Sequence, residues 1–244
     1  MKENKYDDEG FFGKYSAFPR SIDGLNSAGE WHELQKILPD LKDRRILDIG
    51  CGFGWHCLYA IDNGASKVVG IDISEKMLAV ARQKTNSPIV QYQHMAMEDF
   101  DFPYDSFDLV ISSLALHYTP DFRHICEKVS KCISNDGYFI FSVEHPVFTA
   151  YGTQDWYYGE NQKRLHWPVD RYFAEGKRNT RFLDEKVIKY HKTLTTYLNT
   201  LLDTGFSITK CIEPKPADHL LNEVPEMRDE LRRPMMLLIS AKKT

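Results

Sequence analysis

The residues with the clearest chemical potential form a short turn, Asp48-Ile-Gly-Cys-Gly-Phe-Gly54, directly after an apolar strand. Gly50, Gly52 and Gly54 lack a Cβ atom, so the backbone there can adopt positive φ and accept an adenosine-sized group at close range. The helix that follows adds N–H groups without intrahelical partners. A carboxylate at Asp48 disfavours a pyrophosphate and suits a ligand with a positive amine or sulfonium.

The spacing of the glycines separates this turn from a dinucleotide-binding fingerprint. That fingerprint is G-x-G-x-x-G, and its third glycine would fall at Trp55. A second apolar strand, over residues 67–71, ends at Asp72, 18 residues after Gly54. An acidic residue in that place commonly binds ribose hydroxyls.

Three stretches of the chain together resemble the class I S-adenosylmethionine-dependent methyltransferases, of the methyltransferase type 11 kind. Asp48 to Gly54 is similar to the first motif of that family, Gly70-Ile-Asp-Ile-Ser74 to its second, and residues 102–118 to the region around its fourth strand. The resemblance is strong over residues 44–145 and looser after residue 190. It implies S-adenosylmethionine as the cofactor and S-adenosylhomocysteine as the product.

The resemblance also implies roles for individual residues at the cofactor. Asp48 is expected to organise the turn and offset cofactor charge, and Asp72 to accept both ribose hydroxyls. Ala96 stands where the family often has an acidic residue near the adenine amino group, so Glu98, Asp99 or water has to supply that hydrogen bond. The expected cofactor-binding residues are Tyr15, Asp48, Gly50, Cys51, Gly52, Asp72, Ile73, Met97, Glu98 and Ser113.

Methyl transfer from a sulfonium mainly requires alignment of nucleophile, methyl carbon and sulfur, so no nucleophilic side chain is needed. Candidates that contact the substrate or remove its proton are Tyr118, Glu144 and two histidines, because imidazole titrates near neutral pH. We expect His117 and His145 to be catalytic. The alternative for each is an ordinary hydrogen-bonding residue at a strand end.

Strand and helix patterns alternate along the chain, which predicts a Rossmann-like, doubly wound, mostly parallel seven-stranded sheet with helices on both faces. Besides the strand before the turn, we expect strands over 67–71, 89–93, 107–112, 138–143, 207–212 and 235–241. Helices are expected over 55–62, after Ser74, over 121–133, and from Tyr190 to Gly205, with Tyr190-His191 at the start of the last one.

The chain is expected to form a single domain, 1–244, in four parts. These are an N-terminal helical cap (1–43), a cofactor-binding core (44–145), an aromatic substrate lid (146–189), and a closing helix with two strands (190–244). Tyr15 and Phe18 either close over the cofactor or form part of the cap's own core.

The aromatic residues of the lid leave several interpretations open. Trp156 and Trp167 either line a pocket for a flat or apolar substrate, form a cage for a cationic amine, or pack on one another. The lid arginines could bind a carboxylate or phosphate. Trp31 and Trp55 are expected to be structural, since each fits a helix face. The arginines in question are Arg164, Arg171, Arg178 and Arg181.

Composition limits the partners that we expect. The 244 residues carry a net charge of −4, which gives no electrostatic reason to expect nucleic acid, so a small-molecule substrate is favoured. The N-terminus lacks an apolar signal core and no run is long enough to span a membrane, so a cytoplasmic location is expected. Five cysteines without a C-x-x-C pair argue against disulfides, a metal site and iron–sulfur chemistry. A silent cofactor-binding protein, and a methyltransferase of RNA or protein, remain alternatives.

Overall fold

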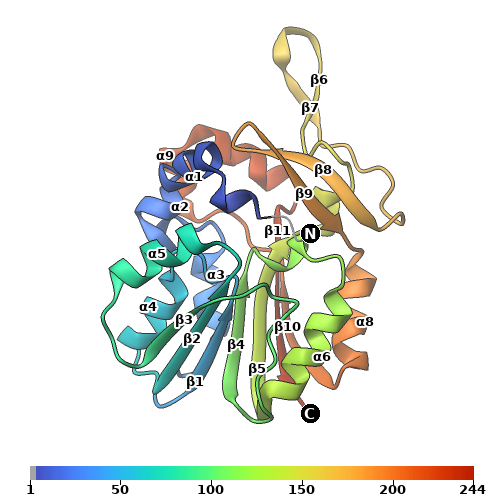
Figure 1. The fold of residues 1–244 in the computed structure, drawn as a ribbon. Coiled ribbons are helices and arrows are strands. Elements are labelled where there is room, and N and C mark those ends of the chain that lie inside the picture. Colours follow the sequence, from blue (N-terminus) through green and yellow to red (C-terminus); the bar gives the residue numbers. More distant parts are fainter. Residues whose placement is uncertain (1–3) are drawn as a thin grey trace.

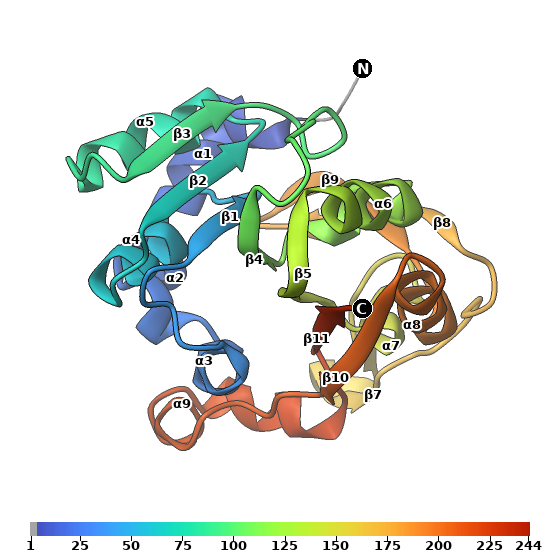
Figure 2. The same ribbon diagram turned by 90° about the horizontal axis from the view of Figure 1, so that it is seen from below.

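The computed structural model describes residues 4–244, with the side chains of Glu223, Pro225 and Glu226 outside that description. Within this range a seven-stranded sheet in the order β10-β11-β5-β4-β1-β2-β3 forms the centre of the molecule (Figures 1 and 2). β11 is antiparallel to both β5 and β10, and the remaining pairs are parallel. The expected fold class is therefore confirmed. The strands are β1 (Arg45–Ile49), β2 (Lys67–Asp72), β3 (Val90–His94), β4 (Phe107–Ser113), β5 (Ile133–Glu144), β10 (Phe206–Ile212) and β11 (Met236–Lys243).

Helices cover both faces of this sheet (Figure 2). Apolar side chains of β1 alternate between two cores: Ile46 joins the core under α3 and α4, whereas Leu47 and Ile49 join the core under α6 and α8. The α-helices are α1 (Glu9–Ser16), α2 (Pro19–Ile22), α3 (Trp31–Ile37), α4 (Trp55–Asp62), α5 (Glu75–Lys84), α6 (Phe122–Cys132), α7 (Pro146–Thr149), α8 (Leu194–Asp203) and α9 (Asp218–Glu223). The 3₁₀ helices are η1 (Lys5–Asp7), η2 (Gly24–Ser27), η3 (Leu116–Tyr118), η4 (Glu160–Gln162) and η5 (Pro225–Arg232).

Local sequence signals set the ends of the core helices. The prediction of a helix over 55–62 is confirmed by α4, which is followed by Gly64 at φ 81°. The Ser74 hydroxyl accepts a hydrogen bond from the Met77 N–H (3.2 Å) and caps α5. Asp121 caps α6 in the same way through the His124 N–H (3.0 Å). These caps fix where the helices start relative to the strand ends.

One core strand begins earlier than expected. β5 starts at Ile133, five residues before the expected start at position 138. Its register against β4 jumps from Phe107–Ile133 to Leu109–Tyr138, so residues 134–137 bulge out of the ladder, with Asp136 at φ 63°. Asn135-Asp136-Gly137, a sequence typical of a turn, therefore forms a bulge within the strand.

The segment between α7 and α8, called here the insertion (residues 150–193), forms two antiparallel hairpins. One pairs β6 (Tyr157–Tyr158) with β7 (Arg164–His166), and the other pairs β8 (Gly176–Phe182) with β9 (Glu185–His191). Figure 1 shows the β6–β7 hairpin projecting away from the molecule, whereas β8 and β9 lie over the upper edge of the sheet.

The prediction that Tyr190 and His191 begin a helix is wrong, because both belong to β9 and α8 starts at Leu194 after a Thr193 cap. Along β9, Val187, Lys189 and His191 are buried in alternation. Two of those three side chains are polar, so the alternation of buried residues does not appear as an alternation of apolar residues in the sequence.

Candidate active site

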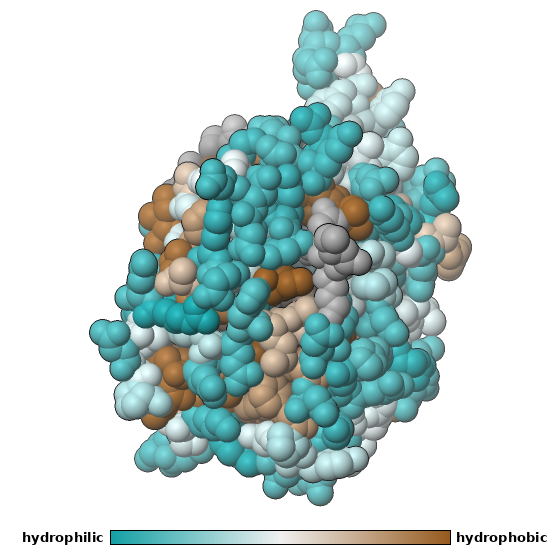
Figure 3. Space-filling model, viewed as in Figure 1, coloured by the Kyte–Doolittle hydropathy of each residue, from teal (hydrophilic) through white to brown (hydrophobic). Residues whose placement is uncertain are grey.

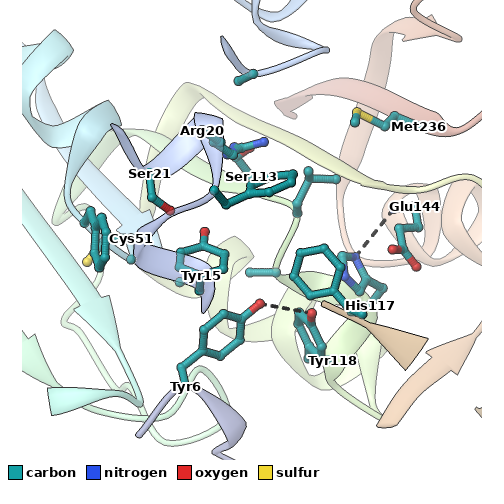
Figure 4. Close-up of a pocket in the computed structure, with 18 of the residues that line it drawn as sticks. Tyr6, Tyr15, Arg20, Ser21, Cys51, Ser113, His117, Tyr118, Glu144 and Met236 are labelled. Atoms are coloured by element: carbon teal, nitrogen blue, oxygen red, sulfur yellow. Dashed lines mark hydrogen bonds between the residues drawn. The ribbon is translucent and has the colours of Figure 1, made fainter. Parts of the chain in front are cut away.

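A cavity of about 870 Å³ lies past the carboxyl ends of β1, β2, β4 and β5. Its volume falls in the upper part of the range of roughly 300–1,000 Å³ that is usual for small-molecule sites. The N-terminal cap, the core, the β8–β9 hairpin and the α9–η5 segment all contribute walls. Figure 4 shows side chains of the cap, such as Tyr15 and Arg20, and of the core, such as Ser113 and His117, facing a common space.

The glycine-rich turn forms one end of this cavity. Gly50 has a φ of 73°, and a Cβ atom on it would lie 2.5 Å from the Ala115 Cβ, so a side chain is excluded there. Gly52 also has positive φ (53°), but the space where its Cβ would stand is open. A ligand can therefore approach the main chain at Gly52, as the sequence predicted.

Asp72 ties this turn to the end of β2. One of its oxygens, Oδ2, accepts from the Gly52 N–H (2.8 Å), and Oδ1 accepts from the Ser74 N–H (2.8 Å). Each carboxylate oxygen keeps a further lone pair, and Asp72 lines the cavity. Burial raises the pKa of this carboxyl above its ordinary value.

Asp48 lies beneath the turn and is absent from the cavity wall formed by the described residues. Its side chain is 1% exposed, and its Oδ2 accepts from the Cys57 thiol (3.4 Å), while Oδ1 has no partner among the described residues. Burial raises the pKa of Asp48 to about 7. Near neutral pH, the carboxyl is thus present in both protonation states.

The other expected cofactor residues do reach the cavity. Tyr15 is one of them, and its ring packs edge-on against Tyr6 (5.2 Å between centroids) and Phe53 (5.8 Å). Tyr6 belongs to the cap and Phe53 to the glycine-rich turn, so Tyr15 packs between cap and core and also lines the cavity. The remaining expected residues that line the cavity are Gly50, Cys51, Gly52, Ile73, Met97, Glu98 and Ser113.

A half-buried arginine near Ser113 escaped the sequence analysis. Arg20 of α2 donates to Glu30 Oε1 (2.7 Å) and to Ser113 Oγ (2.8 Å), and it lines the cavity. Ser113 Oγ in turn donates to the same glutamate oxygen (2.8 Å). Burial disfavours charge on both partners, yet the Arg20 guanidinium holds the pKa of Glu30 below its usual value. A lone arginine in an aromatic segment carries no motif, so no sequence signal marks it.

His117 and Glu144 lie beside one another in the cavity wall (Figure 4). The Glu144 N–H donates to His117 Nδ1 (3.5 Å), and burial lowers the pKa of His117 to about 3. The Glu144 side chain pairs with Lys189 of β9 and accepts from Gln154 (2.7 Å). Burial alone would raise the pKa of Glu144, but the Lys189 ammonium, His117 and the hydrogen bond from Gln154 together outweigh it, and the net shift is downward.

Two tyrosine hydroxyls also meet at the cavity wall. The Tyr6 and Tyr118 hydroxyls lie 3.1 Å apart, and the Tyr118 ring lies 4.5 Å from the His117 ring, centroid to centroid. η1 of the cap supplies Tyr6, whereas η3 after β4 supplies Tyr118. The cap therefore closes directly onto the loop that carries His117.

His145 takes a different position from the one expected for a base. Its Nδ1 accepts from the Val147 N–H (3.0 Å), which caps α7, and its Nε2 lies 2.8 Å from Glu213. The residue is not among the described residues that line the cavity. The structure therefore brings His117, but not His145, to the site.

The lid tryptophans pack around an arginine of the same chain. The guanidinium of Arg233 lies 4.0 Å from the Trp167 ring, 4.6 Å from Phe148 and 5.3 Å from Trp156. The Phe148 and Trp167 rings are stacked (4.9 Å, 13° between planes). The interpretation that the tryptophans pack within the protein is therefore the one that the geometry supports. Arg164, Arg171, Arg178 and Arg181 are also outside the cavity wall formed by the described residues.

Comparison with known proteins identifies the family. Residues 47–141 match the family model of a methyltransferase domain. A structure from Mesorhizobium loti, an S-adenosylmethionine-dependent methyltransferase, is 43% identical (TM-score 0.84; 90% of this chain, 100% of that one). A Listeria monocytogenes structure assigned the same activity is 58% identical (TM-score 0.86; 91% and 99%). A Haemophilus influenzae protein of uncharacterised function is 32% identical over 99% of this chain and 98% of its own length. The chain belongs to the class I S-adenosylmethionine-dependent methyltransferases.

The cofactor of this methyltransferase is S-adenosylmethionine, and the residues at the turn fit it. The open position over Gly52 leaves room against the backbone, and the Asp72 carboxylate is correctly placed at the end of β2 for a ribose. Among residues 4–244, with the three undescribed side chains set aside, no group of three or more His, Cys, Asp or Glu residues is arranged to hold a metal ion. In the same part of the chain, no helix of the methyltransferase has the length and apolar character needed to cross a membrane.

Proposed function

We propose that this methyltransferase transfers the methyl group to a small-molecule acceptor held in the same cavity as the cofactor. The observation that carries the proposal is the single cavity of about 870 Å³, which extends from the Gly52 turn past Asp72 to His117 and Glu144. A concave space walled by cap, core and insertion suits a small molecule better than a polymer.

We assign the cofactor's ribose to Asp72, its methionine portion to the backbone of Gly50 to Gly52, and its adenine to Ile73 and Met97. Arg20 is proposed to bind its carboxylate. When bound, S-adenosylmethionine would supply an activated methyl group, with the electron pair of its carbon–sulfur bond left on sulfur and the new bond made by the acceptor's own lone pair. The protein's part is alignment of the acceptor, exclusion of water by the cap and the β8–β9 hairpin, and a hydrogen bond to the acceptor.

Relatives with named acceptors support a small molecule. A ubiquinone biosynthesis O-methyltransferase from Neisseria meningitidis is 27% identical over 81% of this chain and 92% of its own length. A tRNA U34 carboxymethyltransferase from Hahella chejuensis is 36% identical, but over only 47% of this chain and 37% of its own length. The likeness to the small-molecule enzyme therefore extends beyond the shared core, whereas the likeness to the tRNA enzyme does not.

The test is to incubate the protein with methyl-labelled S-adenosylmethionine and separate small-molecule, RNA and protein fractions of a cell extract. We expect label in the small-molecule fraction, and no transfer by an Asp72→Ala variant. Label confined to RNA or protein would overturn the proposed acceptor class. Normal S-adenosylhomocysteine binding without any transfer would instead favour a silent binding protein.

A further inference from the structure

The cavity continues past the reacting centre into an apolar chamber. We call it the methionine chamber, and it is walled by Leu25, Leu220, Val224, Met227, Met235 and Met236. All six side chains are half-buried, so they neither pack fully into a core nor face open solvent. Much of one wall comes from the strap, residues 218–232, which comprises α9 and η5.

The methionine chamber begins directly beside the residues at the reacting centre. Met236 of β11 stands opposite Glu144 of β5 in the sheet register, so the two side chains share one face. The Met236 Cε lies 3.7 Å from the place of a Cβ on Gly29, which joins the chamber to the cap. In Figure 4, Met236 and Cys51 lie on opposite sides of the labelled residues, with Met236 on the side of Glu144.

Among the described residues of the strap, Glu230 is the one charged side chain in the cavity wall, and an ion pair neutralises its charge. Glu230 accepts two hydrogen bonds from Arg233 (2.6 and 3.1 Å). Because Arg233 is itself enclosed by Phe148, Trp156 and Trp167, the strap is anchored to the insertion. The space-filling view shows a mainly hydrophilic face, with apolar side chains visible in a hollow near its centre (Figure 3).

An apolar wall of this kind needs an apolar occupant. S-adenosylmethionine is assigned to the opposite end, where the glycine turn and Asp72 lie, and it has no comparable apolar group. Methionine side chains are flexible and polarisable, and they adapt to apolar groups of differing shape. Burial of such a group here contributes binding free energy in proportion to the apolar area removed from water.

Building on the proposed small-molecule methyl transfer, we propose that the methyl acceptor is amphipathic. Its nucleophilic group lies beside His117 and Glu144, and an alkyl or ring substituent occupies the methionine chamber.

The experiment uses 4-alkylphenols, from 4-methylphenol to 4-octylphenol, as probes of the protein loaded with S-adenosylhomocysteine. Calorimetric titration is expected to show a dissociation constant that falls about threefold to fourfold per added methylene until the chamber is full. Dissociation constants that do not change with chain length would overturn the proposal. Titration with S-adenosylhomocysteine alone distinguishes a failure of this inference from a failure of the proposed function. If S-adenosylhomocysteine itself does not bind, the assigned cofactor site is wrong.

Two variants on the strap test whether the alkyl chain of the probe binds in the methionine chamber. Met227→Glu places a charge in the chamber and should abolish the dependence on chain length, whereas Leu231→Glu, on the 50% exposed side of the same element, should keep it. Both variants should bind S-adenosylhomocysteine normally. If Met227→Glu fails to fold, Leu220→Asn tests the same wall. Equal chain-length dependence in the wild type and the chamber variant would place the probe elsewhere and contradict the inference.

Discussion

His117 is the polar side chain to which we assign the orientation of the acceptor under the proposed function. Burial lowers its pKa to about 3, so the imidazole is neutral throughout the physiological range. Since Nδ1 accepts from the Glu144 N–H, we assign the ring proton to Nε2. A group with so low a pKa holds a proton poorly. We therefore expect His117 to orient the acceptor through a hydrogen bond, with the acceptor's proton passing to water.

Replacing His117 with Gln should leave S-adenosylhomocysteine affinity unchanged and lower turnover by about 10- to 100-fold, through lost alignment. The pH profile between 5 and 8 should keep its shape, because His117 does not titrate there. The measurement is kcat against pH with an acceptor found by the labelling screen, and exposed His124→Gln on α6 is the control. Loss of an acid limb with a midpoint near pH 6 to 7 in the His117→Gln variant would instead make this histidine a general base.

Asp72 has a structural role, because its two oxygens already accept backbone N–H groups of the turn and of the start of α5, and we propose that it also binds the cofactor's ribose. Asp72→Ala should weaken S-adenosylhomocysteine binding by about 2 to 4 kcal/mol, through lost charge-assisted hydrogen bonds. Calorimetry checks this, with Asp62→Ala at the exposed end of α4 as the control. An unchanged dissociation constant for Asp72→Ala would remove Asp72 from the site.

At the scale of elements, several contacts join the strap to the insertion, among them Arg164–Asp229 (2.7 Å) and Arg232 to the Leu165 carbonyl (2.6 Å), and the adjoining Arg233 is the most buried of these arginines. Arg233 is 8% exposed and combines three aromatic contacts with the Glu230 ion pair. Removing it would leave Glu230 unpaired beside the cavity, and such a change is costlier than loss of a surface pair. The position of the strap over the methionine chamber thus depends on contacts outside the chamber.

Arg233→Ala should therefore lower the free energy of unfolding by about 2 to 4 kcal/mol and speed amide hydrogen exchange in residues 218–232. Urea unfolding and exchange mass spectrometry measure the two effects. Arg228→Ala, an exposed arginine on the same 3₁₀ helix, should change neither quantity by more than about 0.5 kcal/mol. Exchange in the strap that stays at the wild-type rate would mean that other contacts hold it.

The core elements could be predicted from sequence because their signals are local. The glycine turn, the Ser74 cap and the apolar face of α6 each lie within a few residues, and the structure bears all three out. The β8–β9 hairpin could not be predicted, because its turn residues Leu183 and Asp184 reach positive φ (52° and 62°) without a glycine.

Sequence could likewise place His117 and His145 at strand ends, but not decide which one faces the cavity. That depends on side-chain direction and on packing against distant segments. For Arg20, the partners Glu30 and Ser113 come from separate parts of the chain. Buried networks of this kind leave no periodic trace in the sequence.

The cap, the core and the β8–β9 hairpin surround the cavity, and ion pairs and hydrogen bonds join them to one another. Lys189 of the β8–β9 hairpin pairs with Glu144 of the core, and Lys192 donates to the Thr119 carbonyl (2.7 Å). Glu185, at the start of β9, pairs with Lys14 of the cap (3.0 Å). The β6–β7 hairpin projects away from these ties (Figure 1). Cofactor binding should therefore affect the two hairpins of the insertion differently.

We expect amide exchange in residues 176–191 to slow when S-adenosylhomocysteine binds, and to slow further with a 4-alkylphenol, because the ligands fill the space beneath this hairpin. Exchange in residues 157–166 should be the same in every state, because this hairpin is joined to the strap through Arg164 and Asp229 (2.7 Å) and does not line the cavity. Exchange mass spectrometry of the free, cofactor-loaded and doubly loaded protein measures both. A Glu185→Gln variant, which weakens the tie to the cap, should raise exchange in 176–191 of the free protein and lose most of that difference when both ligands are bound. Equal protection of residues 176–191 in all three states would mean that the β8–β9 hairpin is a fixed wall, with acceptor entry and product release left to the strap or the cap.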